Sequence, residues 1–478
     1  MNVWEATGWT GKRVLVLGDV MLDRFIYGDV ERVSPEAPIP VVKYRSQKAM
    51  AGGAGNVACN IVALGGEAVL VGIVGQDGAA GELKEILDRA GISHDLLGSP
   101  RRTTVKVRFV ARGQQLLRSD EEDPAPADEM AERVARIACR WVGGCDAVVL
   151  SDYAKGTLTP GVLKQVIAAA RKAGIPVVVD PKHRDLSRYA GATIVTPNRG
   201  EVAVSTGIDP SDDDAAVQAG LVAREQSQAD AVLVTRGAEG MTLVEGRVAS
   251  HFRSTAKQVF DVSGAGDTVV ATLSLALANG VETDQATRLA NMAAGIAVSK
   301  AGTATVSRTE LIDETLASER DMEGASSLER ACRAVELWRS TGLRIGFTNG
   351  CFDLLHPGHI HLLQQARAAC DRLVVGINSD ASVRLLKGPS RPVQDERARA
   401  SILANLRQVD LVVVFGESTP IELIKALRPD VLVKGADYTK AEVVGGDIVE
   451  SYGGRVLLAD LLKGHSTTAT VRAMAGAG

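Results

Sequence analysis

The segment DVSGAGDTVVATLSLALANG, residues 261–280, joins a turn of small residues to a long apolar stretch of helical character. Gly264, Ala265 and Gly266 lead into the predicted helix, so their backbone N–H groups can surround a phosphoryl group at close range. Asp267 follows at the helix start, where a carboxylate suits a base that deprotonates an attacking hydroxyl. The alternative is that Asp267 only caps the helix, favoured there by the helix dipole. The segment indicates phosphoryl transfer at a helix N-terminus.

Short β-branched runs alternate with Ala- and Leu-rich stretches before this segment. The runs are RVLVLGD (13–19), AVLVGIVG (68–75), DAVVLSD (146–152), IPVVVD (175–180), ATIVTPN (192–198) and AVLVTRG (231–237). This pattern is typical of a mostly parallel sheet covered on both faces by helices. Ligands of such sheets bind at the carboxyl ends of the strands. The polar residues that close the runs are therefore candidates for a site, although turn formation explains many such residues: Asp19, Asp152, Asp180 and Asn198.

Two segments interrupt the alternation of strand and helix. Residues 39–44 (IPVVKY), and the pair TTVKVRFVA (103–111) and QQLLRSD (114–120) joined across Arg112 and Gly113, predict extended hairpin structure. In the second segment Val105, Val107 and Phe109 fall on one face, and Lys106 and Arg108 fall on the other. A ribbon of this kind, projecting from the main sheet, would serve as a lid or a dimer contact.

A polar stretch, ASERDMEGASS (317–327), separates this series from a second one. The later strands are predicted at RIGFTNG (344–350), RLVVGIN (372–378), DLVVVF (410–415), DVLVKG (430–435) and RVLLAD (455–460). We therefore expect an α/β fold in two domains, residues 1–318 and 343–478, with a linker and leading helix at 319–342. The first is a doubly wound sheet with a β-ribbon, and the second is a smaller Rossmann-like domain.

Composition excludes several other classes of protein. Lys and Arg total 54 against 58 for Asp and Glu, a net charge of −4, which leaves no broad basic field for nucleic acid. The N-terminus lacks the pattern of a signal peptide, and no apolar run approaches the ~20 residues of a membrane span. The six cysteines are scattered without a CxxC pair, as in a reducing compartment. We expect a cytoplasmic protein without nucleic-acid or membrane partners.

A second glycine segment, GGAGNVACNIVALG (52–65), precedes another predicted helix and accompanies GDVMLDR (18–24). Together with GAGD, this arrangement resembles the ribokinase-like carbohydrate kinases over roughly residues 10–310. The resemblance implies that Asp267 is the catalytic base, with Gly264, Ala265 and Gly266 as its anion hole. It also implies sugar binding by Asp19, Asp23, Gly52, Gly53 and Asn56, nucleotide contacts from Asn198, Glu201, Thr235 and Gly237, and magnesium organised by Glu201. The family's usual threonine after the first aspartate of the motif is absent, since Val262 and Ser263 lie there.

Finer features point to one branch of these kinases. VLGDVMLDRFIYGDVERVSPEAPIPVV (16–42) and LSDYAKG (150–156) are similar to bacterial kinases that phosphorylate heptose 7-phosphate at its anomeric position. A substrate that is already phosphorylated needs a cationic pocket. The candidates for it, each otherwise an ordinary solvated charge, are Lys155, Arg108, Arg118 and Lys182.

Three of the chain's seven histidines lie in HPGHIH, residues 356–361. His356 and His359 share a face of the first helical turn, and Pro357 falls where its missing N–H costs little. Two imidazoles at a helix N-terminus can donate hydrogen bonds to a phosphate. Zinc is the competing interpretation, but helical zinc pairs usually stand four residues apart and no nearby Cys or carboxylate cluster completes a site. The pattern favours phosphate.

The motif TNGCFDLLHPGH (348–359) resembles the HxGH nucleotidyltransferases, a family that covers about residues 340–475 here. The resemblance implies attack by an acceptor phosphate on the α-phosphorus of a nucleoside triphosphate. Besides His356 and His359, it implies nucleotide contacts from Asn349, Gly350, Phe352, Lys387, Arg399, Lys434, Ser466, Thr467 and Thr468, with Arg397 as the alternative to Arg399. Cys351 needs no chemical role, and we expect a small buried hydrophobe.

The order of the two halves is similar to the bifunctional heptose kinase/adenylyltransferases. Membership would imply that ATP and Mg²⁺ convert D-glycero-β-D-manno-heptose 7-phosphate to the 1,7-bisphosphate. Heptose 1-phosphate and a second ATP would then yield ADP-heptose, a lipopolysaccharide core precursor, with a separate phosphatase acting between the steps. A homodimer through the kinase domain is expected from the family. The alternatives are a different sugar phosphate or CTP, or a non-catalytic sensor, which would not need both GAGD and HPGH.

Overall fold

The structure, a computed structural model, describes residues 9, 11–123, 128–256, 258–300, 302–318, 325–436 and 438–460. The chain divides into two compact units, Met1–Leu311 and Ile312–Gly478. The division falls inside α9 (Arg308–Ser318), a few residues before the position expected from the polar stretch. The end of α9 joins the second unit because Trp338 of α10 (Leu328–Ser340) donates a hydrogen bond to Asp313 at 3.1 Å.

The main sheet of the first unit has nine strands in the order β13-β12-β11-β10-β9-β8-β1-β4-β5. The parallel strands are β1 (Arg13–Gly18), β4 (Glu67–Val74), β5 (Ser93–Gly98), β8 (Ala147–Ser151), β9 (Val177–Asp180), β10 (Ile194–Val195) and β11 (Ala231–Thr235). Two antiparallel strands close one edge, β12 (Met241–Glu245) and β13 (Val248–Phe252). The predicted parallel runs are confirmed, while β5, β12 and β13 were not predicted.

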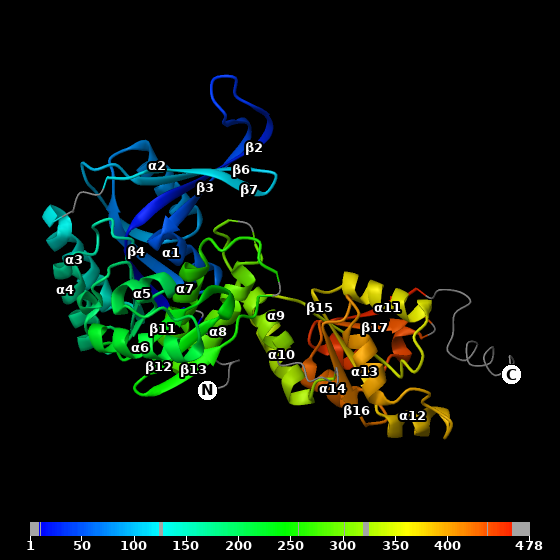
Figure 1. Cartoon of the computed structure of the whole chain (residues 1–478). Helices are drawn as coiled ribbons and strands as arrows, with labels where there is room; N and C mark the ends of the chain where they lie inside the picture. The colour runs from blue at the N-terminus through cyan, green and yellow to red at the C-terminus, as the bar shows by residue number, and fades with distance from the viewer. Residues whose placement is uncertain are drawn as a thin grey trace. The chain divides into compact units, whose positions relative to one another are not determined.

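Helices cover both faces of this sheet (Figure 1). They are α1 (Ala54–Ala63), α2 (Gly78–Arg89), α3 (Asp128–Val142), α4 (Pro160–Ala173), α5 (Arg199–Thr206), α6 (Asp213–Ser227), α7 (Ala265–Ala278) and α8 (Thr283–Ala297), with short 3₁₀ turns η2 (Leu186–Tyr189) and η3 (Gly237–Glu239). Alternate residues of β1 enter different cores: Val14 and Val16 join one, and Leu15 and Leu17 join the other. This doubly wound arrangement confirms the predicted fold class.

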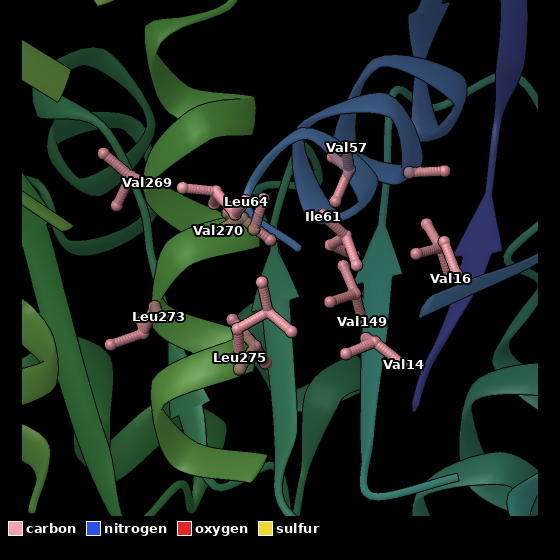
Figure 2. Packing of buried hydrophobic residues seen from close by; sticks show 14 of the residues in the cluster. Val14, Val16, Val57, Ile61, Leu64, Val149, Val269, Val270, Leu273 and Leu275 are labelled. Carbon is pink, nitrogen blue, oxygen red and sulfur yellow. The ribbon is translucent and has the colours of Figure 1, made fainter. Parts of the chain in front are cut away.

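Helices α1 and α7 pack side by side over β1 and β8 (Figure 2). Val57 and Ile61 of α1 share a buried cluster with Val270 and Leu273 of α7. Full burial of each such side chain contributes about 1.5–3 kcal/mol. Because this packing is apolar and dense, it holds the N-terminus of α7 rigidly at the carboxyl edge of the sheet.

A separate four-stranded sheet stands off the main sheet within this unit (Figure 1). Its order is β3-β2-β6-β7, with bounds β2 (Val20–Val33), β3 (Pro40–Gly53), β6 (Thr104–Ala111) and β7 (Gln114–Glu121). Arg112 and Gly113 both have positive φ, 52° and 79°, as a tight hairpin turn requires. The predicted hairpin is confirmed, and the 14-residue β2 enlarges it into a sheet.

The second unit has a parallel sheet in the order β16-β15-β14-β17-β18. Its strands are β14 (Ile345–Gly350), β15 (Arg372–Asn378), β16 (Leu411–Phe415), β17 (Val431–Gly435) and β18 (Arg455–Ala459), and all five were predicted. Its remaining helices are α11 (Pro357–Ala368), α12 (Asp380–Lys387), α13 (Glu396–Ala404), α14 (Ile421–Leu427) and α15 (Gly446–Ser451), with η4 (Lys440–Glu442). No helix in the described part of either unit is long and apolar enough to cross a membrane.

Candidate active sites

Asp267 lies in the first turn of α7, of which Ala265 is the first residue and Gly264 the N-cap. Gly264 has a φ of 78°, and a Cβ there would lie 2.8 Å from Asn56 Nδ2, so only glycine fits. Among the described residues, the backbone amides of Gly266 and Asp267 have no hydrogen-bond acceptor. A Cβ on Gly266 would meet no atom within 4 Å. This helix end therefore has two N–H groups without an acceptor and no side chain crowding Gly266, as anion-binding helix ends do.

The Asp267 carboxylate is held by two donors and is 5% exposed. Asn56 Nδ2 lies 2.6 Å from Oδ2, and the Tyr153 hydroxyl lies 2.8 Å from Oδ1. Burial raises the pKa of Asp267 to about 6, while the two hydrogen bonds act in the opposite direction. The group is therefore ionised at neutral pH and able to accept a proton. Tyr153 was not predicted, although it lies just beyond the carboxyl end of β8, where site residues are expected.

Asp19, which follows β1, holds the loop after β8. Its Oδ2 accepts hydrogen bonds from the amides of Tyr153 and Lys155, each at 2.9 Å, and its Oδ1 accepts one from Thr157 at 3.0 Å. The residue is 1% exposed. The expectation for Asp19 was sugar binding, but in the structure both of its oxygens organise this loop.

Asp23 of β2 lies against the glycines that end β3. A Cβ on Gly52 would stand 2.3 Å from Asp23 Oδ2, and Gly53 has a φ of 57°. Arg108 Nη1 donates to Asp23 Oδ1 at 2.5 Å, with the two side chains only 11% and 5% exposed. The structure thus brings Asp23 and both glycines together. It also shows that Arg108 already neutralises a buried carboxylate.

The other predicted cations of this site are ion-paired. Lys155 pairs with Glu122, and Arg118 Nε lies 2.8 Å from Asp120 Oδ1. Lys106, which was not predicted as a site residue, lies 5.7 Å from the centre of the Tyr153 ring. Burial lowers the pKa of Lys106, and the charge of Asp23 raises it.

Lys106 has no ion pair among the described residues. Arg101, a second cation that sequence reasoning missed, donates to the carbonyl of Lys155. Both could have been found only from tertiary neighbours, because neither is in a motif.

The NRGE and TRG segments are neighbours at the same sheet edge. Asn198 and Glu201 form a capping box at α5, with two reciprocal hydrogen bonds of 3.0 Å, and Asn198 bridges to Thr235. Glu201 Oε1 accepts a hydrogen bond from Lys182 at 3.0 Å. Gly237, with a φ of 60°, begins the turn after β11. These residues are therefore gathered as expected, with Glu201 partly engaged in capping.

Asp180, the last residue of β9, adds a carboxyl group next to Glu201. Burial raises the pKa of Asp180 well above its ordinary value, and the charges of Asp267 and Glu201 raise it further. Within the described residues, no three His, Cys, Asp or Glu side chains are arranged to hold a metal ion by themselves. Mg²⁺ usually takes only one or two carboxylates together with substrate phosphates, so these acids suit it as partners of a bound nucleotide.

The second unit has a cavity of about 610 Å³ at the carboxyl ends of its strands. It is lined by residues from the end of every strand or just beyond: Asn349 and Gly350, Asn378, Phe415, Lys434, and Asp460. Seven predicted residues line it together: Asn349, Gly350, Phe352, His356, His359, Lys387 and Lys434. Lining residues that the sequence did not predict include Thr348, Asn378, Ser418 and Thr419.

The two motif histidines lie at the start of α11. His356 is its N-cap, Pro357 is in its first turn, and the rings of His356 and His359 stack with centres 3.8 Å apart. Burial lowers the pKa of His359 to about 4, helped by the charges of His356 and Lys387. The His359 imidazole is therefore neutral at neutral pH. An anionic phosphate placed against it would favour its protonated form.

Arg399 is not among the residues that line the cavity. It is 1% exposed, and its guanidinium bonds to Asp380 Oδ1 and the Cys351 carbonyl, each at 2.6 Å, and to the Gln394 carbonyl at 3.1 Å. The predicted nucleotide contact is thus corrected: all three guanidinium nitrogens are engaged, and they tie the loops at Cys351 and Gln394 to the first residue of α12. The Asp353 carboxylate supports the same loops by accepting from the Val393 amide at 2.7 Å.

Cys351 is also corrected, because it is half-buried and lines the cavity, with Sγ 3.7 Å from Asn378 Oδ1. The predicted contacts Ser466, Thr467 and Thr468 lie outside the described residues.

Comparisons with known proteins agree with two catalytic units. Residues 12–310 match the model of the pfkB family carbohydrate kinases, and residues 347–465 match the cytidylyltransferase-like family. The chain is 55% identical over 473 residues to the bifunctional protein HldE of Caulobacter vibrioides, covering 98% of this chain and 97% of that protein. The chain belongs to the HldE family of bifunctional proteins. HldE of Rhodospirillum rubrum is likewise 55% identical, and the match covers 97% of this chain and 95% of that protein.

Solved structures confirm the ribokinase-like fold of the first unit. Phosphofructokinase-2 from Escherichia coli covers 65% of this chain with a TM-score of 0.56 and 20% identity, and all of that chain is matched. Ribokinase from Arabidopsis thaliana has a TM-score of 0.51 and 22% identity, covering 64% of this chain and 98% of its own. Membership of the HldE family makes the protein an enzyme with two activities. It confirms the expectation of a heptose kinase and adenylyltransferase in ADP-heptose biosynthesis.

Proposed function

We propose that Asp267 is the base of the kinase reaction, removing the proton from the anomeric hydroxyl of D-glycero-β-D-manno-heptose 7-phosphate. The oxygen then attacks the γ-phosphorus of ATP, ADP leaves, and the 1,7-bisphosphate forms. The observation that carries this proposal is the buried Asp267, held by Asn56 and Tyr153 beside the two free amides of an α-helix N-terminus. The amides offset charge on the transferred phosphoryl group.

The nucleotide of this unit would lie against the neighbouring NRGE and TRG segments, through Asn198, Thr235 and Gly237. Mg²⁺ would be held by Glu201, next to Asp180, together with the phosphates of ATP. Glu201 and Asp180 are close enough to interact electrostatically, and one or two carboxylates together with phosphates are the ligands that Mg²⁺ usually takes. When bound, the ion would neutralise charge on the phosphates. The residues of the chain would then position the phosphates in line with the sugar hydroxyl.

The sugar would bind beside Asp23 and the glycines Gly52 and Gly53, which lie together on β2 and β3 of the four-stranded sheet. Its 7-phosphate would be met by cations of β6, β7 and the loop after β8, namely Lys106, Arg108, Arg118 and Lys155. Lys106 is the strongest candidate of these, because it alone has no ion pair among the described residues and thus brings a positive charge that is not yet neutralised. Asn56 and Asp19 are assigned to holding the base and its loop.

In the second unit, the phosphate of heptose 1-phosphate would attack the α-phosphorus of a second ATP, releasing pyrophosphate and forming ADP-heptose. His356, His359, Lys387 and Lys434 would stabilise the charge on the phosphates, since all four line one cavity. Asn349, Gly350 and Phe352 would shape the nucleotide pocket. No covalent enzyme intermediate is needed, so positioning and charge carry this step.

The two half-reactions do not join directly, because the kinase product still has a 7-phosphate. A separate phosphatase would remove that group between the steps. We also propose a cytoplasmic location and a homodimer through the four-stranded sheet. All eight residues of the edge strand β7 are exposed, including Leu116 and Leu117, so this edge offers unpaired backbone and apolar side chains to a second copy.

The proposal is tested by assaying each half-reaction separately on the full chain. Asp267→Asn should abolish ATP-dependent formation of the 1,7-bisphosphate and leave ADP-heptose formation from heptose 1-phosphate nearly unchanged. A kinase rate equal to that of the wild type would eliminate Asp267 as the base. Replacing ATP with CTP in the second assay tests nucleotide choice, and faster turnover with CTP would overturn the adenylyl assignment.

A further inference from the structure

We propose that Tyr153 is a positioning residue of the kinase site, whose hydroxyl fixes the orientation of the Asp267 carboxylate for proton abstraction. This role rests on the proposed assignment of Asp267 as the base. The direct evidence is the 2.8 Å hydrogen bond from the Tyr153 hydroxyl to Asp267 Oδ1. With Asn56 bound to the other oxygen, the carboxylate cannot rotate without losing a hydrogen bond.

The backbone around Tyr153 is held from two sides, so its ring has a defined position. Asp19 accepts a hydrogen bond from the Tyr153 amide, and Asp152 Oδ1 accepts one from the Ala154 amide at 2.8 Å. Ala154 has a φ of 56°, a left-handed conformation that costs a non-glycine residue about 1–2 kcal/mol. Such a conformation persists only where surrounding contacts enforce it. Asp19 and Asp152 supply these contacts, so the carboxylate of Asp19 serves to hold the loop.

Tyr153 acts as a donor and not as an acid. Burial raises the pKa of Tyr153 well above its ordinary value, and the charge of Asp267 raises it further. The phenol therefore keeps its proton at neutral pH. The proton taken from the sugar stays on Asp267, and Tyr153 keeps the accepting carboxylate in place.

Charged groups on three strands surround Asp267 and set the background for its titration. Asp23 of β2 raises the pKa of Asp267, and Lys106 of β6 lowers it. Asp180 of β9 interacts with Asp267 as a like charge. The Tyr153 hydrogen bond acts on the ionised carboxylate directly and lowers its pKa. Removing only that bond leaves the surrounding charges unchanged.

The test is the pH profile of kinase kcat for Tyr153→Phe in the full chain, with heptose 7-phosphate and ATP saturating. The acidic limb should move up by about one pH unit, because a hydrogen bond to the ionised form is lost. Above the limb, kcat should remain about tenfold below wild type with little change in KM, because the base is less well oriented. The phenyl ring retains the packing beneath Lys106.

Tyr189→Phe is the matched control. Its hydroxyl donates to Asp152 Oδ2 at 2.7 Å and is buried at the same sheet edge, without touching Asp267. The acidic limb of the kcat profile of Tyr189→Phe should coincide with that of the wild type. Replacement of Tyr153 by 3-fluorotyrosine, a stronger donor of nearly the same size, should move the limb to lower pH and serves if the Phe variant does not fold.

Coinciding limbs for wild type, Tyr153→Phe and the fluorotyrosine protein would overturn the role of Tyr153. Loss of kinase activity in Asp267→Asn, together with such coinciding limbs, would leave Asp267 as the base and remove only this inference. Full kinase activity in Asp267→Asn would instead remove the proposed function itself.

Discussion

Replacing Asp267, the proposed base of the kinase reaction, by asparagine should raise the free energy of unfolding of the first unit. In Asp267→Asn a buried charge is removed, while a side chain of the same shape remains. The pKa of Asp267 is raised by burial from 3.8 to about 6, a difference of about two units. At 1.36 kcal/mol per unit, ionisation of Asp267 in the folded protein costs about 3 kcal/mol above pH 6.

The gain from the substitution is partly offset. The introduced asparagine has one acceptor oxygen, which can face Asn56, and one amide group, from which the Tyr153 hydroxyl can accept. Two hydrogen bonds to a charged group thereby become bonds between neutral groups, at a cost of about 1–2 kcal/mol. The net effect at pH 8 is a stabilisation of about 1–2 kcal/mol.

The pH dependence is the sharper part of this prediction. The folded pKa of Asp267 is higher than the unfolded one, so the protonated carboxyl favours folding and the advantage is lost as pH rises from about 4 to 6. Below pH 4 the carboxyl is protonated in both states. The stability difference between Asp267→Asn and wild type should therefore shrink by about 1.5 kcal/mol between pH 8 and pH 5.

Urea unfolding followed by pulsed hydrogen exchange measures this difference unit by unit. Peptides from α7 report on the first unit, and peptides from β14 report on the second, which should not change. Asp19→Asn is the control of opposite sign, because three backbone amides depend on its two oxygens and the loop should lose stability. If the stability difference between Asp267→Asn and wild type stayed constant from pH 5 to pH 8, the buried and ionised state of Asp267 would be refuted.

Three further outcomes are expected. His359→Ala should lower ADP-heptose formation about 100-fold by removing one phosphate donor, with the kinase unaffected, as a pyrophosphate-release assay would show; an unchanged rate would refute the role of the HPGH motif. Lys106→Met should raise the KM for the sugar phosphate about tenfold but not the KM for ATP in steady-state kinetics, and an unchanged sugar KM would remove Lys106 from the substrate site. Arg399→Met should lower the stability of the second unit by about 2–4 kcal/mol, seen as a lower urea midpoint for β14, since Asp380 and the Cys351 carbonyl lose their partner; an unchanged midpoint would mean that the buried guanidinium is not a structural anchor.

The two sites differed in how much of them could be predicted. In the second unit, the resemblance to the HxGH nucleotidyltransferases implied Asn349, Lys387 and Lys434 together with the HPGH motif, and all of them line one cavity. Arg399 was misassigned because a buried anchor and a phosphate ligand use the same guanidinium chemistry. Only its 1% exposure and its three acceptors separate the two roles.

The kinase site depended more on contacts between distant segments. Tyr153 and Asn56 are separated from Asp267 by 114 and 211 residues, yet both bind its carboxylate. Lys106 was placed on the correct face of its strand by the two-residue period, but nothing local showed that this face covers Tyr153.

The sequence by itself determined the chemistry that its local motifs encode. The glycine turn before Asp267, the histidine pair three residues apart and the strand-ending polar residues all act within one or two turns of chain, where spacing alone sets geometry. Tertiary structure alone decided which charges are free and which are engaged. Asp19 binds loop amides, Arg108 binds Asp23, and Arg399 binds Asp380 and two backbone carbonyls. The physical reason is that burial and partner choice arise when remote segments pack, and the energy of a charge depends on those neighbours more than on its own identity.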